Sequence, residues 1–141
     1  MKKNNKGFSL VELIIVIAIM AILAGALAPA LIKYIAKSRR STDVSNAQTI
    51  ATAVTNALSV ENAYDAATPD SPYTINADGT QLGTGDAFSS EVTSQLGASK
   101  YKPKYDKEAG NFIFTLSSDK STFTVTVGNS ELYPDVCAEY K

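Results

Sequence analysis

Glu12 has the least ordinary surroundings of any ionisable residue in the chain, because it lies in an apolar N-terminal stretch directly before Leu13. From Leu13 to Ile32 the chain runs for twenty residues without a charge. A carboxylate in such a span is costly, and ionisable residues placed there usually have a function or a partner of opposite charge. Glu12 is therefore the first candidate for a functional side chain.

A second candidate is the segment 100–105, which reads Lys-Tyr-Lys-Pro-Lys-Tyr. Basic side chains interleaved with aromatic rings can neutralise and stack on single-stranded nucleic acid. The pattern also fits an edge strand with Tyr101, Pro103 and Tyr105 on one face, because lysine and proline discourage strands from aggregating edge to edge. We favour the edge strand, so nucleic acid is a conceivable partner but not the expected one.

The composition excludes several kinds of catalytic and metal site. The 141 residues include no histidine and a single cysteine, Cys137. A histidine-dependent triad and a histidine-ligated zinc site therefore cannot form, and neither can an internal disulfide or a multi-cysteine metal site. The acidic residues lack the spacing of an EF-hand loop. We expect no catalytic residue, no metal and no cofactor, and so no enzyme.

The charges are distributed unevenly along the chain. Residues 1–40 carry seven basic residues and one acidic residue, a net charge of +6, whereas residues 41–141 carry six basic and thirteen acidic residues, a net charge of −7. This split favours a membrane or assembly role for the basic part.

The uncharged run from Leu13 to Ile32 is long enough to cross a membrane. As a helix it would extend about 30 Å, the thickness of a bilayer core. A cleaved signal peptide is one alternative, because small residues around Ala26 resemble a cleavage site. However, Pro29 closely follows this possible cleavage site and Glu12 lies in the apolar stretch, and both features argue against a signal peptide. A plain membrane anchor is the second alternative, but it leaves Glu12 unexplained.

The third alternative explains these details together. Residues 6–13, Lys-Gly-Phe-Ser-Leu-Val-Glu-Leu, followed by the long aliphatic run, resemble the N-terminal signature of type IV pilins and related pseudopilins. Gly7, Phe8 and Glu12 match the last leader residue, the first mature residue and the glutamate five residues into the mature chain. Pro29 falls where family members commonly kink the helix. The close match covers about residues 1–40.

The resemblance implies a processing route and a set of partners. A prepilin peptidase would cut between Gly7 and Phe8, and the same enzyme would methylate the new amine of Phe8. The partners would be identical pilin subunits, the membrane, an assembly platform protein and an assembly ATPase. Before assembly the protein would be a single-pass protein of the bacterial cytoplasmic membrane with its head outside the cytoplasm, and afterwards it would be part of a cell-surface pilus.

Helical periodicity continues beyond the apolar run. Val44, Ala47, Ala51, Val54 and Leu58 recur at steps of three and four residues, which predicts one apolar face of an amphipathic helix. We therefore expect a single helix from about residue 8 to about residue 60. Pro29 removes a backbone donor and is expected to make a kink or flexible joint.

The remaining residues predict a small α+β head. Strands are expected at 111–116 and 123–127 from their alternating pattern, with a possible short strand at 73–75 in a long loop over 62–86. Asp86 is expected to cap a short helix that ends at Gly97. The apolar faces of the strands would pack on the amphipathic helix, the helix-on-sheet arrangement of an α+β fold and of the pilin family. The expected parts are a leader (1–7), a membrane or filament-core helix half (8–32), an amphipathic helix half (33–60) and the head (61–141).

The favoured function is a structural subunit of a type IV pilus used for adhesion, motility, biofilm formation or DNA uptake. A pseudopilin of a type II secretion or competence system is the alternative within the family. A membrane-anchored binding module, using the basic segment 100–107 for DNA, is the alternative from another class. Cys137 has no partner in the chain, unlike the disulfide-closed C-terminal regions of many pilins.

Overall fold

The computed structural model divides into two units, residues 1–37 and residues 38–141. The residues that it describes are 4, 6–78, 82 and 85–141. The leader lysines Lys2 and Lys3 and the expected loop glycines Gly79 and Gly83 lie outside these residues.

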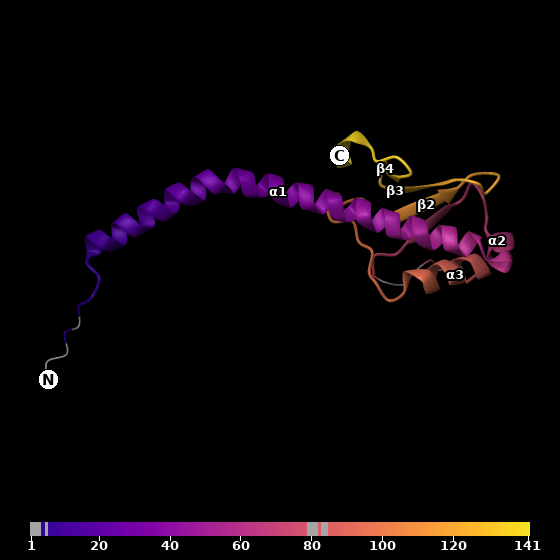
Figure 1. Ribbon diagram of the computed structural model, residues 1–141, viewed down its shortest axis with the longest axis horizontal. Coiled ribbons are helices and arrows are strands. Elements are labelled where there is room, and N and C mark those ends of the chain that lie inside the picture. Colours follow the sequence, from indigo (N-terminus) through magenta and orange to yellow (C-terminus); the bar gives the residue numbers. More distant parts are fainter. Residues whose placement is uncertain (1–3, 5, 79–81, 83–84) are drawn as a thin grey trace. The chain divides into compact units, whose positions relative to one another are not determined.

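One long helix, α1, runs from Leu10 to Leu58 (49 residues) and confirms the predicted N-terminal helix (Figure 1). The helix continues through Pro29 without interruption. A proline inside a helix leaves one carbonyl without its backbone donor, which weakens the helix locally. The flexible joint expected at Pro29 stays a prediction.

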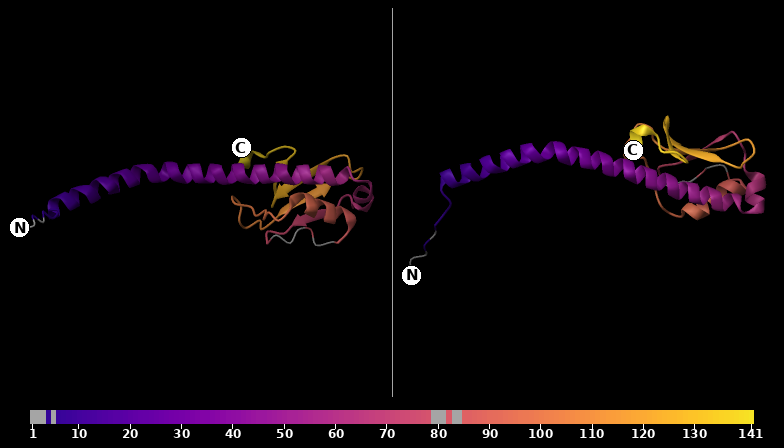
Figure 2. Two further views of the ribbon diagram at one scale, coloured as in Figure 1. Left: turned by 60° about the horizontal axis from the view of Figure 1, so that its bottom comes forward. Right: turned by 45° about the horizontal axis from the view of Figure 1, so that its top comes forward.

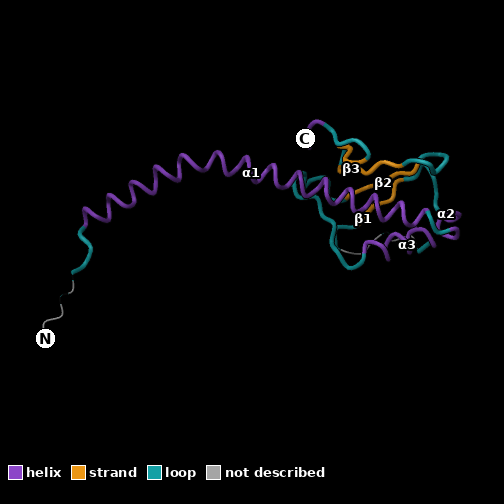
Figure 3. Tube along the Cα trace, in the orientation of Figure 1, coloured by secondary structure: helices purple, strands orange, loops and turns teal. Residues whose placement is uncertain are grey.

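The described part of the head contains one antiparallel sheet of four strands in the order β1-β2-β3-β4. Figure 3 labels β1, β2 and β3 beside α1. The strands are β1 (Pro72–Ile75), β2 (Phe112–Leu116), β3 (Phe123–Val127) and β4 (Ser130–Tyr133). In the β2–β3 hairpin Phe112 pairs with Val127 and Phe114 with Val125, so the large apolar side chains share one face. The two predicted strands and the short strand in the loop are confirmed, whereas β4 was not predicted.

The core of the head forms between this sheet face and the apolar stripe of α1. Ala47, Ile50 and Val54 on α1 are fully buried, as are Phe112 and Phe114 on β2. The α+β arrangement of a long helix on a small antiparallel sheet is therefore confirmed, and it is consistent with a pilin fold.

Two further helices complete the head. In α3 (Ala87–Leu96) the side chain of Asp86 accepts a hydrogen bond of 2.7 Å from the backbone N–H of Ser89, which confirms the predicted N-cap. The helix ends at Gly97, whose φ of 66° is readily adopted by glycine. A six-residue helix, α2 (Glu61–Ala66), follows α1 where the sequence predicted loop, and a short 3₁₀ turn, η1 (Ala138–Tyr140), lies near the C-terminus.

The segment 100–105 is not an edge strand, so that prediction was wrong. Its burial still alternates: Tyr101 and Pro103 are buried, and the intervening lysines are exposed. The segment is held by Asp43, a fully buried carboxylate of α1. The backbone N–H of Lys104 donates to its Oδ1 at 2.8 Å, and the N–H of Tyr105 donates to its Oδ2 at 2.9 Å. These amides bond to a side chain of α1 instead of a neighbouring strand.

Hydroxyl groups along α1 bond back to the helix itself. The side chains of Thr42, Thr49, Thr52, Thr55 and Ser59 each donate to the carbonyl oxygen four residues earlier, at 2.8–3.1 Å. Such bonds satisfy the hydroxyl donor within the helix and often bend it slightly.

Phe114→Ala tests the core, because Phe114 is fully buried and its ring stacks on Tyr73 with a centroid separation of 4.9 Å. We expect a fragment starting near Lys33 to be soluble and monomeric, and the substitution to lower its free energy of unfolding by about 3–5 kcal/mol. Denaturant unfolding measures the change. Phe123→Ala, at a half-buried ring, is the matched control and should cost less. A loss below about 1 kcal/mol for Phe114→Ala, the typical effect of an arbitrary substitution, would contradict this inner face.

Asp43→Ala tests the attachment of the segment 100–105. Two backbone amides lose their charged acceptor, so we expect a loss of about 3 kcal/mol in the free energy of unfolding, at the upper end for hydrogen bonds to a charged group. Hydrogen exchange at the amides of Lys104 and Tyr105 should accelerate beyond the global effect. Asp65→Ala, at an exposed aspartate, is the control. Equal protection of both amides in Asp43→Ala and wild type would show that the carboxylate does not hold the segment.

Candidate functional site

The predicted cleavage position lies immediately before α1 in exposed, non-helical chain. Gly7 is exposed, and the side chain of Phe8 is 90% exposed. A Cβ added to Gly7 would have no neighbour within 4 Å. Nothing in the described chain therefore requires glycine here for packing. A requirement for glycine would come from an enzyme that must approach the backbone closely.

Glu12 takes part in the start of α1 in a way that the sequence analysis missed. The backbone N–H of Ser9 donates to its Oε2 at 2.9 Å, and the N–H of Glu12 donates to the Ser9 hydroxyl at 3.2 Å. This reciprocal pair is a capping box, which satisfies amides at a helix N-terminus. The Ser-x-x-Glu spacing in the sequence was the available signal.

The capping box gives the charge of Glu12 a role within its own helix. The side chain lies in the first turn of α1, where the helix dipole favours a negative charge. Within the described chain only the Oε2 atom of Glu12 accepts a hydrogen bond, and the residue is exposed. A carboxylate offers about four lone-pair sites, so Glu12 keeps capacity for a further donor.

The helix that follows Glu12 has an apolar surface that the described part of its own unit does not cover. Large apolar side chains from Leu13 to Ile32 are between 48% and 72% exposed. Helix α1 is long and apolar enough to span a membrane, and the apolar window within it has no buried residue. Apolar exposure on this scale marks a surface that contacts lipid or other protein.

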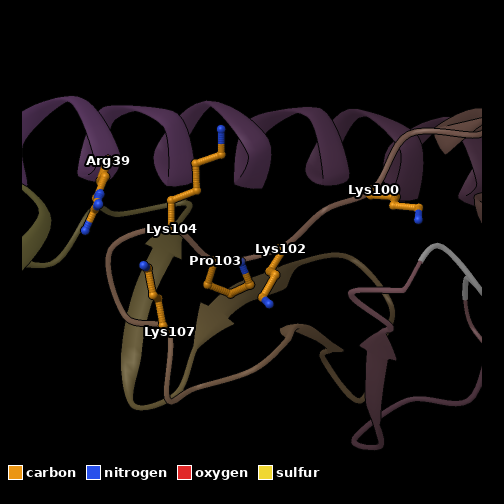
Figure 4. A pocket seen from close by; sticks show the side chains of 6 residues that line it. All are labelled: Arg39, Lys100, Lys102, Pro103, Lys104 and Lys107. Atoms are coloured by element: carbon orange, nitrogen blue, oxygen red, sulfur yellow. The ribbon is translucent and has the colours of Figure 1, made fainter. Parts of the chain in front are cut away.

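A second site lies in the head, where a pocket of about 400 Å³ is bordered by cationic side chains (Figure 4). We call it the basic cradle. Its lining residues are Arg39, Lys100, Lys102, Pro103, Lys104 and Lys107. The close view shows Pro103 between Lys102, Lys104 and Lys107, with Arg39 approaching from α1. The structure thus brings together the lysines of the predicted basic segment 100–107 and adds Arg39 to them.

The aromatic residues beside the basic cradle do not offer stacking platforms. Tyr101 is only 8% exposed. Tyr105 is half-buried, with the Arg40 guanidinium 5.2 Å from its ring centroid and the ring of Tyr140 at 5.2 Å in an edge-on arrangement. Stacking of nucleic-acid bases needs exposed ring faces, so the cradle presents charge without the interleaved aromatic surface that the sequence suggested.

The C-terminal residues contact α1 near the start of its head portion, beside the basic cradle. The Arg40 side chain donates to the backbone carbonyl of Glu139 at 3.1 Å. The Tyr140 hydroxyl is buried, and within the described part of the chain it has no hydrogen-bond partner. Burial, with the nearby charge of Asp43 adding to it, raises the pKa of Tyr140 to about 12. Cys137 is a free, half-buried thiol that packs at the edge of the core.

The described residues contain no group of three or more cysteine, aspartate and glutamate side chains placed to hold a metal ion. The described residues therefore contain two candidate functional sites. One is the N-terminal segment around Gly7, Phe8 and Glu12, and the other is the basic cradle of the head.

Comparison with known protein families matches residues 2–28 to the prokaryotic N-terminal methylation motif. No solved structure matches the chain. The matched residues include the exposed Gly7–Phe8 bond, the capping box and most of the apolar run. Together with the long helix and the antiparallel sheet of the head, this motif supports a type IV pilin-like, or prepilin-like, protein.

Proposed function

We propose that this protein is a structural subunit of a type IV pilus that is processed by a prepilin peptidase and polymerised into a filament. The observation that carries the proposal is the methylation motif at residues 2–28, which is continuous with an apolar helix that no described residue of its own unit covers. Lipid covers such a surface before assembly, and copies of the same helix cover it afterwards. The motif belongs to a structural, pilin-like family and not to a family of enzymes.

Processing would occur at the bond between Gly7 and Phe8. The exposure of both residues and the open space around Gly7 support access by a membrane-embedded peptidase. The cut leaves Phe8 with a free amine for methylation and removes the basic leader. Because Glu12 is only four residues further on, the new amine lies about one helical turn from its carboxylate.

The subunit would be stored in the cytoplasmic membrane with its head outside the cytoplasm. The motif and the apolar helix support membrane anchoring. An assembly platform and a cytoplasmic ATPase would then extract it into a surface filament. In that filament the apolar parts of α1 form the core, and the heads form the outer layer.

Glu12 would set the register of subunit addition. In an apolar bundle an unpaired carboxylate costs several kcal/mol. A neighbouring subunit that is displaced along the axis can bring its Phe8 amine to Glu12, and both groups are charged near neutral pH by their reference pKa values of about 4.3 and 8. The capping box leaves room for this partner, because only one carboxylate oxygen is used by Ser9. Other displacements leave the charge unpaired.

The proposal predicts the mass of the protein in surface filaments. Filaments sheared from the cells should contain a chain that begins at methylated Phe8, because the leader is removed and the helix is kept. Intact-mass spectrometry measures this directly, and the full-length chain from the membrane fraction is the reference. A chain that begins near Leu27 or Pro29 would instead indicate a conventional secreted protein and would overturn the proposal.

Substitutions at Glu12 separate its two roles. A pairing worth only about 1.4 kcal/mol changes incorporation tenfold, so Glu12→Ala should be inserted and processed normally yet enter filaments at least about tenfold less well. Glu12→Gln is the sharper variant, because glutamine can complete a capping box with Ser9 but carries no charge. We expect it to fail in assembly as Glu12→Ala does. The measurement is the ratio of processed subunit in sheared filaments to processed subunit in membranes.

The control for these variants is Glu91→Ala, which removes a carboxylate from α3 in the head and should assemble normally. Wild-type assembly of Glu12→Gln together with failure of Glu12→Ala would assign Glu12 to helix capping alone. Wild-type assembly of both variants would end the register hypothesis.

A further inference from the structure

Cationic and acidic side chains lie in different parts of the head, and the cationic ones gather at the basic cradle. Five cationic side chains line the pocket and all of them are exposed, whereas no carboxylate of the described residues lines it. Among the described residues none of the five has an ion pair within 4.0 Å or a side-chain hydrogen bond. The nearest carboxylate on α1, Asp43, is fully buried and accepts the backbone amides of Lys104 and Tyr105. Within the described head the cationic side chains of the cradle therefore have no ion-pair partner.

Carboxylates gather where α1 ends, in a group that we call the acidic end. Its members are Glu61, Asp65, Asp70 and Asp119, all exposed. The Ser118 hydroxyl donates to Asp70 at 2.7 Å, and the Lys120 ammonium donates to the Tyr64 carbonyl at 2.7 Å. These two bonds join α2, the turn between β2 and β3, and the segment before β1. Lys120 is the one cation that these contacts bring in, so the acidic end keeps a net negative charge.

Asp119 shows that this negative charge is maintained. The hydroxyls of Ser117 and Ser121 donate to its carboxylate at 2.6 and 2.8 Å. These hydrogen bonds lower the pKa of Asp119 to about 2, so the group is ionised at any physiological pH.

The basic cradle and the acidic end lie at opposite ends of the head. Arg39 lies at the start of the head portion of α1, whereas Glu61 follows the last residue of α1, Leu58. At 1.5 Å per residue, the nineteen residue steps from Arg39 to Leu58 correspond to about 30 Å along α1. Both views in Figure 2 show α2 at one end of the head and the C-terminal residues that contact Arg40 at the other.

We propose that the basic cradle of one head receives the acidic end of the head of a second copy that is displaced along the filament axis. This inference rests on the proposed pilus function and names a contact of the same polymer. Two different surfaces meet in such a contact, and a head-to-tail interface that does not close into a ring produces an open filament. The charges select this order, because two cradles or two acidic ends would repel each other.

A nucleic acid is the less favoured occupant of the cradle. The rings of Tyr101 and Tyr105 are buried or already packed, so bases have no stacking surface. The thirteen carboxylates after residue 40 would also repel a polyanion. An acidic protein surface meets neither difficulty.

Charge reversal in the full-length protein tests the proposal in cells that lack the wild-type copy. The cradle variant carries Lys102→Glu and Lys104→Glu, and the acidic-end variant carries Glu61→Lys and Asp65→Lys. All four side chains are exposed, and the cradle contact of Lys104 to Asp43 uses its backbone, so folding should persist. Each variant should give about tenfold less filament than wild type per processed subunit, because like charges across an interface cost several kcal/mol.

The combination of the two variants should recover most of the wild-type yield, because it restores opposite charges with the signs exchanged. Lys141→Glu, which changes an exposed lysine outside the cradle, is the charge control and should assemble normally. High salt should weaken wild-type filaments more than filaments of the cradle variant, because ions screen exposed charge pairs.

A wild-type yield from the cradle variant, or a combined variant no better than either parent, would overturn the inference. Normal filaments that lose retention of duplex DNA would overturn it in favour of a nucleic-acid surface. These results leave the pilus function intact, since the wild-type protein still forms filaments. If the wild-type protein enters no filament, the proposed function fails and this contact fails with it.

Discussion

Twenty uncharged residues form the first part of α1, and the described part of their own unit leaves them uncovered. Their large side chains are about half exposed or more, and their burial would contribute roughly 25 cal/mol for each Å² removed from water. The need to cover this apolar surface explains the other N-terminal features. In the proposed function, the leader, the exposed peptide bond before α1 and the carboxylate near the helix start would all help to deliver this surface to lipid or to other copies.

The head provides its own core and so does not depend on that surface. The face of the sheet that carries Phe112 and Phe114 covers the apolar stripe of α1. Asp43 extends the attachment by binding the chain 61 and 62 residues further along. A buried carboxylate is costly unless it is well bonded, and here several amide contacts provide that bonding. One helix thus belongs to two environments, with an apolar surface all round in its first part and a narrow apolar stripe in its last part.

Features encoded by nearby residues were predictable from the sequence. The long helix, the β2–β3 hairpin and the Asp86 cap depend on patterns within a few residues, and the motif around Gly7, Phe8 and Glu12 is a contiguous match. The strand β4 was missed because Ser130 and Glu131 obscure its alternation. The role of Asp43 depends on partners more than sixty residues away, which no local pattern reveals. The grouping of Arg39 with Lys107 likewise depends on the fold and could not be predicted. The capping box, in contrast, could have been predicted from the spacing of Ser9 and Glu12.

The hydroxyl groups that bond back along α1 make its polar face less hydrophilic than its composition suggests. Thr49, Thr52 and Thr55 already donate their hydroxyl protons to carbonyl oxygens of the same helix. If another element covers these three threonines, their hydroxyl donors lose no water partner, and so the usual desolvation penalty of an unpaired donor does not arise for them. Hydropathy scales assign these residues the cost of free hydroxyls. At these threonines the face can therefore change between a wet and a dry environment at little cost, a property that would suit a helix whose neighbours change, as the proposed assembly requires.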